Sequence, residues 1–225
     1  MGLLFSVTYQ KTMTRNDGTR TFFAPEYDNA PQRVYTEDNH NTQTLFGAIG
    51  NLSLKINNNH TISFKNIYSS NADDRVLTRD GVNDVINDPS IYFKSYALWF
   101  TSNKIYSSQL IGEHYLPASK LRFNWVASYS DIRRDIPALR RMAFDSSAGS
   151  AAYNAKLFDP NPVDNDNTAG LSFYATNREK VNNFKFDVSR AFKFTDKIQS
   201  TFKVGGYYQM RDRKFNPRLL AFCNY

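Results

Sequence analysis

Two clusters of charged residues are the part of this sequence whose side chains could bind or react. Arginine guanidinium groups bind carboxylate or phosphate through two parallel hydrogen bonds, and aspartates nearby can pair with them instead. The clusters are Asp73, Asp74, Arg75, Arg79 and Asp80, and Arg133, Arg134, Asp135, Arg140 and Arg141. Either the two clusters form reciprocal ion pairs that hold neighbouring loops together, or they contact a ligand or lipopolysaccharide. We favour the loop network, in which each exposed pair contributes only ~0–1 kcal/mol.

No other motif indicates catalysis, a cofactor or a metal. A nucleophile elbow, a phosphate-binding loop and a metal-binding helix motif are all absent. His40, His60 and His114 lie far apart in the sequence without ligand spacing, so we expect structural or exposed roles for them. The Asp-rich stretch 159–167 lacks the spacing and the glycine of an EF-hand loop and is interpreted as a solvated loop. The single cysteine, Cys223, excludes a disulfide framework within the chain and a cysteine-based zinc site.

Composition excludes some partners and leaves a membrane location open. The 225 residues carry a formal net charge of +7, but lysines and arginines are dispersed, so we expect no nucleic-acid binding. Mean hydropathy is −0.56 and no apolar run reaches the ~20 residues of a membrane-spanning helix. A strand with one lipid-facing and one wet face also averages as polar, and the 15% aromatic content suits such strands.

The segment KLRFNWVASYS, residues 120–130, alternates strictly between two kinds of side chain. One parity carries Leu121, Phe123, Trp125, Ala127 and Tyr129, and the other carries Lys120, Arg122, Asn124, Ser128 and Ser130, with Val126 as its exception. A period of two residues predicts a β-strand with two different faces. We expect the apolar parity of this strand to face lipid.

The same alternation recurs along most of the chain. Apolar parities run through 3–9, 46–56, 62–68, 184–194 and 198–210. Charges on the opposite parity of the last two segments, Lys185, Asp187, Lys193 and Lys203, would face a wet lumen, whereas Arg190 falls on the apolar parity and is an exception. The long, less regular segment 93–116 is interpreted as a strand with a bulge or bend.

The connections between these strands alternate between short and long. Tight turns are predicted at 57–59, 117–119 and 195–197, and long polar loops at about 13–41, 72–92 and 132–168. Short turns at one end and long loops at the other are the organisation of an outer-membrane barrel. Aromatic residues near the long-loop end, Tyr9, Tyr68, Trp99, Phe100, Tyr129, Tyr207 and Tyr208, are predicted to form its outer girdle.

Three ordered segments also resemble a known family. LFGAIGNLSLKINNNHTISFKNIYSSNADDRVLTRDG, YALWFTSNKIYSSQLIGEHYL and LRFNWVASYSDIRRDIPALRR, within residues 44–145, resemble the barrel of TonB-dependent receptors, particularly those of Bacteroidetes. The resemblance implies a barrel of about 22 strands filled by a plug. We therefore expect an all-β chain: about seven antiparallel strands of a larger transmembrane barrel, without a plug domain, a TonB box or a signal peptide.

Function, location and partners follow from that resemblance. It implies a segment of a bacterial outer-membrane receptor that imports a scarce or large solute, such as an iron chelate, a vitamin or a glycan, without catalysis by this segment. Expected partners are outer-membrane lipid and lipopolysaccharide, the TonB complex through a plug, the imported solute and a surface lipoprotein.

Other classes of protein remain open at this point. One is a passive porin or another barrel that does not use TonB, and another is a soluble, secreted β-sandwich that binds carbohydrate. A barrel enzyme such as a lipase or protease is disfavoured, because no Ser/His/Asp set is evident.

Overall fold

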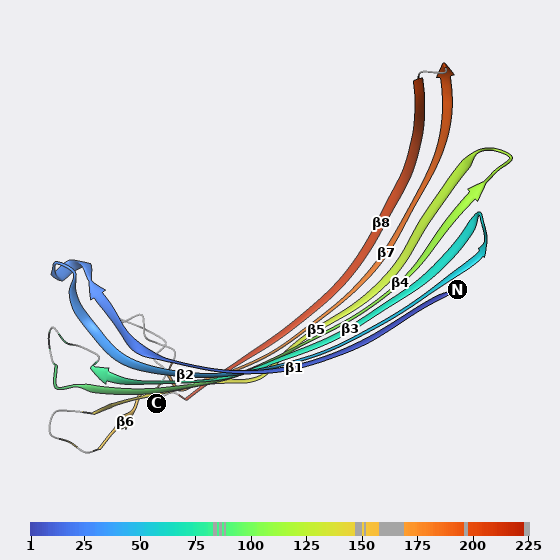
Figure 1. Ribbon diagram of the computed structural model, residues 1–225. Coiled ribbons are helices and arrows are strands. Elements are labelled where there is room, and N and C mark those ends of the chain that lie inside the picture. The colour runs from blue at the N-terminus through green and yellow to red at the C-terminus, as the bar shows by residue number, and fades with distance from the viewer. Residues whose placement is uncertain are drawn as a thin grey trace.

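The computed structural model describes residues 1–82, 85, 87, 89–146, 150, 152–157, 169–195 and 198–222. These residues form one curved layer of β-sheet (Figure 1). Its elements are β1 (Gly2–Ala24), the 3-10 helix η1 (Pro25–Tyr27), β2 (Ala30–Asn57), β3 (His60–Val82), β4 (Tyr92–Leu116), β5 (Leu121–Ser146), β6 (Asn154–Ala155), β7 (Leu171–Thr195) and β8 (Ile198–Ala221). In the described residues, no helix has the length and apolar character to span a membrane.

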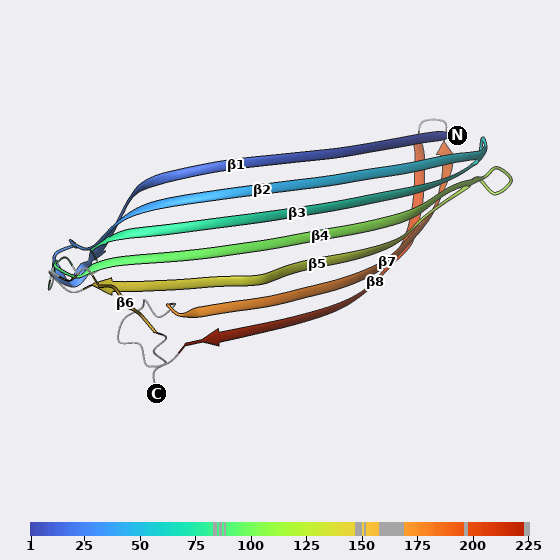
Figure 2. The same cartoon turned by 90° about the horizontal axis from the view of Figure 1, so that it is seen from below.

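Seven long strands lie side by side in nearly the order of the sequence, as Figure 2 shows. The order is β1-β2-β3-β4-β5-β7-β8, every neighbouring pair is antiparallel, and the short β6 pairs with β5 beside this path. The expectation of an all-β, antiparallel chain with about seven strands is confirmed. β1 and β8 are the edges of an open sheet, so these residues do not close into a barrel among themselves.

Short turns gather at one end of the sheet, as predicted (Figure 1). Between β2 and β3, the Asn57 side chain accepts a hydrogen bond from the Asn59 amide, which closes the turn. Between β4 and β5, the Lys120 amide donates to the Pro117 carbonyl, and Lys120 adopts a φ of 53°. Thr195 at the end of β7 pairs with Ile198 at the start of β8, while the predicted turn residues Asp196 and Lys197 lie outside the described residues.

The prediction of long polar loops at about 13–41, 72–92 and 132–168 was largely wrong, because strands occupy most of these stretches. β1 and β2 stay paired as far as Ala24 and Ala30, β3 runs to Val82 and β5 to Ser146. The apolar alternation stops within these stretches. The backbone ladder nevertheless continues through them, and cross-strand pairs such as Arg15–Asp38 replace apolar contacts. The connections at this end are nevertheless longer than the turns at the other.

Pairing between strands places all the predicted apolar parities on one face, because directly opposed residues in a sheet project to the same side. One row across the sheet reads Leu3, Leu52, Phe64, Leu110, Ala127, Phe184 and Tyr208. The next row, on the other face, reads Leu4, Asn51, Lys65, Gln109, Ser128, Asn183 and Gln209. We call these two sides the apolar face and the polar face.

The apolar face is not covered by a second layer in the described part of the chain. Phe64 and Leu110 lie on central strands of the sheet, yet 43% and 39% of their surfaces are exposed. On the polar face, in contrast, Thr101, Val181 and Asp187 are buried. The side chains of one sheet therefore crowd together on the polar face and spread apart on the apolar face.

Hydrogen bonds between strands tie the polar face together. Asn124 donates to Asp187 at 3.0 Å, and Lys203 lies 3.2 Å from the same carboxylate. Asn183 donates to Ser128, and Tyr207 donates to Asn183. The predicted placement of Lys185, Asp187 and Lys203 on one face is confirmed by the register, and the side chain of Lys193 lies outside the described residues.

The predicted irregularity in 93–116 belongs to the neighbouring strand. β4 pairs with β3 without a shift along its whole length. Against β5 the register changes between Trp99 and Ser102, and β5 shows a matching shift against β7 between Ile136 and Leu139. The extra residue therefore lies in β5, at Pro137-Ala138, where proline has no N–H to donate to the ladder.

A small buried cluster lies on the polar face at the end opposite the short turns. It contains Tyr35, Phe93, Ala143 and Ala169, with Phe22 packed against it. The Tyr35 ring lies 5.0 Å from that of Phe93 and 5.9 Å from that of Phe22. This cluster joins β1, β2, β4 and β5, and four of its residues also line a cavity on the polar face.

Candidate ligand-binding cavity

The two charged clusters lie within strands, not in loops, and strand parity divides each of them between the faces. Asp73, Arg75, Arg79, Arg134 and Arg141 lie on the polar face, and Asp74, Asp80, Arg133, Asp135 and Arg140 lie on the other. No ion pair joins the two clusters within the described residues. Their charged partners come from elsewhere: Arg79 pairs with Glu37, Lys94 with Asp80, and Arg133 with Asp131.

Three of the predicted arginines meet in one cavity of about 460 Å³ on the polar face. The cavity is lined by Arg20, Phe22, Arg75, Leu77, Arg79, Phe93, Ser95, Tyr96, Ala97, Trp99, Arg141, Met142, Ala143, Lys156 and Ala169. Its size suits a small organic solute. Five of these side chains are cationic, and none is acidic.

Strand pairing explains both the floor and the walls of the cavity. On β4, Ser95 and Ala97 are small and leave open space between longer neighbours. Arg79, Leu77 and Arg75 of β3 stand opposite Ser95, Ala97 and Trp99. On the other side, Ala143 and Arg141 of β5 stand opposite Ser95 and Ala97. A floor of short side chains is thus enclosed by guanidinium groups and aromatic rings.

The bulge at Pro137 is what brings Arg141 into this cavity. Odd-numbered residues of β5 from Leu121 to Arg133 lie on the apolar face. The extra residue at 137–138 reverses the alternation, so Arg141 is on the polar face and Arg140 is on the other. Arg141 is accordingly half-buried, whereas Arg140 is exposed.

Some of the cationic groups are neutralised, and two are not. Glu37 binds Arg79 at 2.6 Å and lies 3.6 Å from Arg20, and Lys156 pairs with Asp145 at 3.0 Å.

Arg75 and Arg141 have no carboxylate partner in the described structure. Arg75 donates through Nε to the side-chain oxygen of Asn39 at 2.9 Å. Trp99 Nε1, on the same wall, is buried without an acceptor among the described residues. The cavity therefore presents hydrogen-bond donors and positive charge that no described group satisfies.

Sequence reasoning missed several lining residues, namely Arg20, Phe22, Phe93, Lys156 and Ala169. They come from strands or connections remote in the sequence, and the register that unites them is not visible in any one segment. Alternation alone could have grouped Arg75, Leu77 and Arg79, which share a parity. Each charge cluster grouped consecutive residues, although the side chains of consecutive strand residues lie on opposite faces of the sheet.

The residues of the predicted aromatic girdle do not all lie on one face of the sheet. Trp99 and Tyr207 lie on the polar face, because each is adjacent in its strand to a residue of the opposite face. Phe100 is on the same side as the apolar row but stands opposite Asp74, well beyond the apolar residues. Tyr9, Tyr68 and Tyr208 lie on the apolar face.

A line of aromatic residues does border the apolar face. It consists of Tyr9, Phe46, Tyr68, Tyr106, Tyr129, Phe184 and Tyr208. Tyr9 pairs with Phe46, whose ring lies 6.1 Å from that of Tyr68, and Tyr68 pairs with Tyr106. The line crosses the ladders obliquely, because Phe184 and Tyr208 stand in the row of Leu3, whereas Tyr9 lies farther along β1. Beyond it, the same side of the sheet carries ion pairs such as Arg15–Asp38.

The three histidines, which lie far apart in the sequence, include one contacting pair near the short turns. His60 and His114 stand opposite each other, with their Nδ1 atoms 3.0 Å apart. Trp125 donates from Nε1 to His114 Nε2, and its indole lies over Gly112, where a Cβ would collide with it. No group of three or more potential metal ligands occurs in the described residues. The Asp-rich stretch 159–167 and Cys223 lie outside them.

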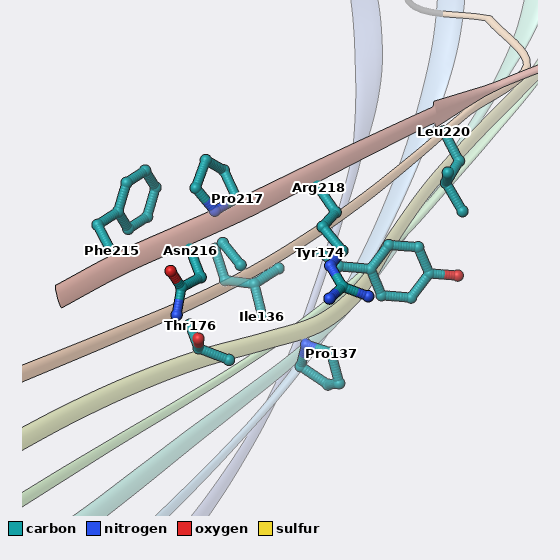
Figure 3. Close-up of a pocket in the computed structure, with 10 residues that line it drawn as sticks. Ile136, Pro137, Tyr174, Thr176, Phe215, Asn216, Pro217, Arg218 and Leu220 are labelled. Atoms are coloured by element: carbon teal, nitrogen blue, oxygen red, sulfur yellow. The ribbon is translucent and has the colours of Figure 1, made fainter.

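A second cavity, of about 790 Å³, lies where the β5 bulge meets β7 and the edge strand β8 (Figure 3). Ile136 and Pro137 line it from β5, and Tyr174 lies beside Arg218, its partner in the β7–β8 ladder. Figure 3 shows Phe215 and Pro217 on the opposite side of β8 from Arg218. Arg218 is its one charged lining residue among those described, so this cavity offers less for recognition than the arginine-lined one.

Comparison of the chain with protein-family models, with curated proteins and with solved structures gives no match.

Proposed function

We propose that this chain forms part of the wall of an outer-membrane β-barrel, and that the barrel belongs to a TonB-dependent receptor. The observation that carries the first half of the proposal is the continuous, uncovered apolar face across all seven long strands. A soluble sandwich would pack this face against a second sheet, whereas in a bilayer lipid tails cover it.

The dimensions of the apolar face support a membrane. On β5 it runs from Leu121 to Tyr129, nine residues, and about 9–11 are needed to cross a bilayer with a tilted strand. Tyrosine rings with polar tips suit the boundary between lipid and water. The oblique path of the aromatic line across the ladders is what a belt parallel to the membrane requires when the strands are tilted.

Arg190, the exception on the apolar parity, is compatible with this arrangement. It stands opposite Leu121 and Phe202, close to the short-turn end of the strands, and it is exposed. A long arginine side chain there reaches the lipid headgroups with its charge while its methylenes contact lipid.

The polar face supports the role of a channel wall. The Asn124–Asp187–Lys203 contacts lie on the polar face at the level where the opposite face is apolar. The arginine-lined cavity lies farther along the strands, at the end with the longer connections. In this proposal the cavity lies above the membrane on the inner side of the wall, where it receives the imported solute.

The family assignment rests on the resemblance of the three segments within residues 44–145. It adds the plug, the TonB complex and a surface lipoprotein as proposed partners, and energised uptake of an iron chelate, a vitamin or a glycan as the proposed activity. The chain's residues supply the wall and the binding surface, and no catalytic step is assigned to them.

The test uses the product of the complete gene in its own cell. It should sediment with the outer membrane, resist extraction by alkaline carbonate, and migrate differently on gels before and after boiling. Recovery in the aqueous fraction would remove the barrel. Uptake that stops when a protonophore collapses the inner-membrane gradient supports TonB dependence, and uptake that persists would favour a passive porin.

A further inference from the structure

We propose that the arginine-lined cavity binds a small anion that combines carboxylate or phosphate groups with a flat, apolar part. Identifying this anion as the imported solute rests on the proposed function. As a statement about binding, the inference can be tested without transport.

The cavity carries positive charge that the described carboxylates do not fully neutralise. Glu37 and Asp145 neutralise part of the charge from Arg20, Arg79 and Lys156, but Arg75 and Arg141 form no ion pair with a carboxylate in the described structure. Half-buried guanidinium groups are stabilised by an anion, and each can bind a carboxylate or phosphate with two hydrogen bonds.

The unneutralised arginines lie on strands either side of β4. Arg75, on β3, stands opposite Trp99 of β4. Arg141, on β5, stands opposite Ala97, which is two positions from Trp99 along β4. Residues related in this way lie on one face within about 7–8 Å, within reach of long side chains. Trp99 lies on β4, between β3 and β5, and its Nε1 is buried without an acceptor among the described residues. Arg75, Trp99 and Arg141 thus line one cavity from three neighbouring strands, and none of the three pairs with a carboxylate in the described structure.

Part of the cavity wall is apolar. Phe93 is buried, and Phe22 packs beside it against Tyr35, so the cavity has an aromatic side as well as a cationic one. The guanidinium of Arg20 already lies 5.0 Å from the centre of the Phe22 ring. A solute with a planar ring gains contacts there that free phosphate or acetate would not gain.

The cavity's face selects a solute rather than a lipid headgroup. It opens on the polar face, opposite the side that carries Leu110 and Phe184. A phosphate of lipopolysaccharide would instead meet the charges on the apolar side, such as Arg133 and Arg140. Adjacent arginines in β5 thus provide a matched pair: Arg141 in the cavity and Arg140 outside it.

The test measures binding to the product of the complete gene in detergent by calorimetry. Benzene-1,3,5-tricarboxylate serves as the probe, its uncharged tricarboxamide as the neutral analogue, and inorganic phosphate as the ring-free anion. The tricarboxylate should bind at least tenfold more tightly than either. Equal affinity for the neutral analogue would overturn the proposal.

Substitutions then locate the site. Arg141→Gln and Arg75→Gln should each weaken tricarboxylate binding about tenfold or more, whereas Arg140→Gln should leave it within about twofold. Arg141→Lys, which keeps the charge without the planar fork, should lie between them. Trp99→Phe, which keeps a ring but removes the N–H, should weaken binding severalfold. An equal loss in Arg140→Gln and Arg141→Gln would contradict the assigned site.

Two further readings separate the sources of failure. Competition by purified lipopolysaccharide that depends on Arg140, with no effect of Arg141→Gln, would assign the anion site to lipid and overturn the proposal. Binding that depends on Arg75 and Arg141 in a protein that fractionates as soluble would keep the cavity's chemistry and remove the transport role. A protein that stays in the membrane through carbonate extraction but does not bind the tricarboxylate would leave the barrel proposal standing and overturn the binding proposal.

Discussion

Arg141 stands opposite Ala97 in the β4–β5 ladder, although alternation counted from Tyr129 would place it on the other face. The difference is one extra residue at Pro137-Ala138, which both neighbouring strands lack. A local irregularity in a single strand thereby decides which of two adjacent arginines enters the cavity.

Deleting Pro137 should therefore be tolerated. Removing the extra residue restores a regular ladder while Leu139 and Arg141 keep their faces, so tricarboxylate affinity should stay within about threefold. Deleting Ser130, in the regular part of β5, should abolish binding or assembly, because it reverses every side chain on one side of the deletion. Binding lost equally in both variants would contradict this role of the bulge.

Arginine placed on the apolar face should destabilise the protein far more than arginine on the polar face. Leu110 lies between Leu116 and Tyr106, near the middle of the apolar zone, and Gln109 precedes it on the polar face. Leu110→Arg should cost about 2–4 kcal/mol of the free energy of unfolding from lipid bilayers. Gln109→Arg should cost less than about 1 kcal/mol. Denaturant unfolding measures both, and equal costs would contradict the membrane placement.

The strand register can be tested by a disulfide. Ser107 and Ser130 stand opposite each other on the polar face, with their hydroxyl oxygens 3.0 Å apart. In a Cys223→Ser background, Ser107→Cys with Ser130→Cys should form a disulfide on mild oxidation, detected as a reduction-sensitive gel shift. Ser107→Cys with Tyr129→Cys is the matched control, and it should not form one because its side chains lie on opposite faces. Crosslinking only in the control would mean that the register is displaced by one residue.

A pH effect is expected at the Arg15–Asp38 pair, which lies beyond the aromatic line. The hydrogen bond from Arg15 holds the pKa of the Asp38 carboxyl below its usual value near 3.8, with a smaller contribution from His40. Because the pKa is lowered in the folded protein, the stabilisation is present above pH 3.8 and is lost as the pH falls through the folded pKa.

Arg15→Gln should raise the pKa of Asp38, as measured by infrared titration of an isotope-labelled aspartate carboxyl with Asp38→Asn identifying the band. The effect on stability should be small, because both side chains are solvent-exposed. An unchanged Asp38 titration in Arg15→Gln would show that the pair does not form in solution.

Much of this fold follows from alternation in the sequence, and the site does not. The parity of Leu121, Phe123 and Trp125 is a local property, set by the two-residue period of a strand, and the register aligns it with its neighbours. Strand length was underestimated because beyond residues such as Tyr9 both faces are polar, so the period disappears while backbone pairing continues.

The cavity depends on relationships that no single segment contains. Arg20, Arg75 and Arg141 come from three strands, and their meeting requires both the register and the β5 bulge. Pro137 indicated an interruption of the ladder, but its presence alone does not say on which face the following residues emerge. The girdle prediction erred at Trp99 for a related reason, because it used position along the strand and ignored parity.

The most direct test of the membrane-facing sheet is the accessibility of spin labels placed one at a time from Ser107 to Ile111 and from Trp125 to Ser130. The product of the complete gene, with Cys223→Ser, is reconstituted in lipid bilayers, and collision rates with oxygen and with a water-soluble nickel chelate are measured. Labels at Ser108, Leu110, Ala127 and Tyr129 should collide often with oxygen and rarely with the nickel chelate. Labels at the residues between them should show the opposite pattern. Low collision rates with both reagents at Leu110 and Ala127 would mean that protein covers this face, and the account would be wrong.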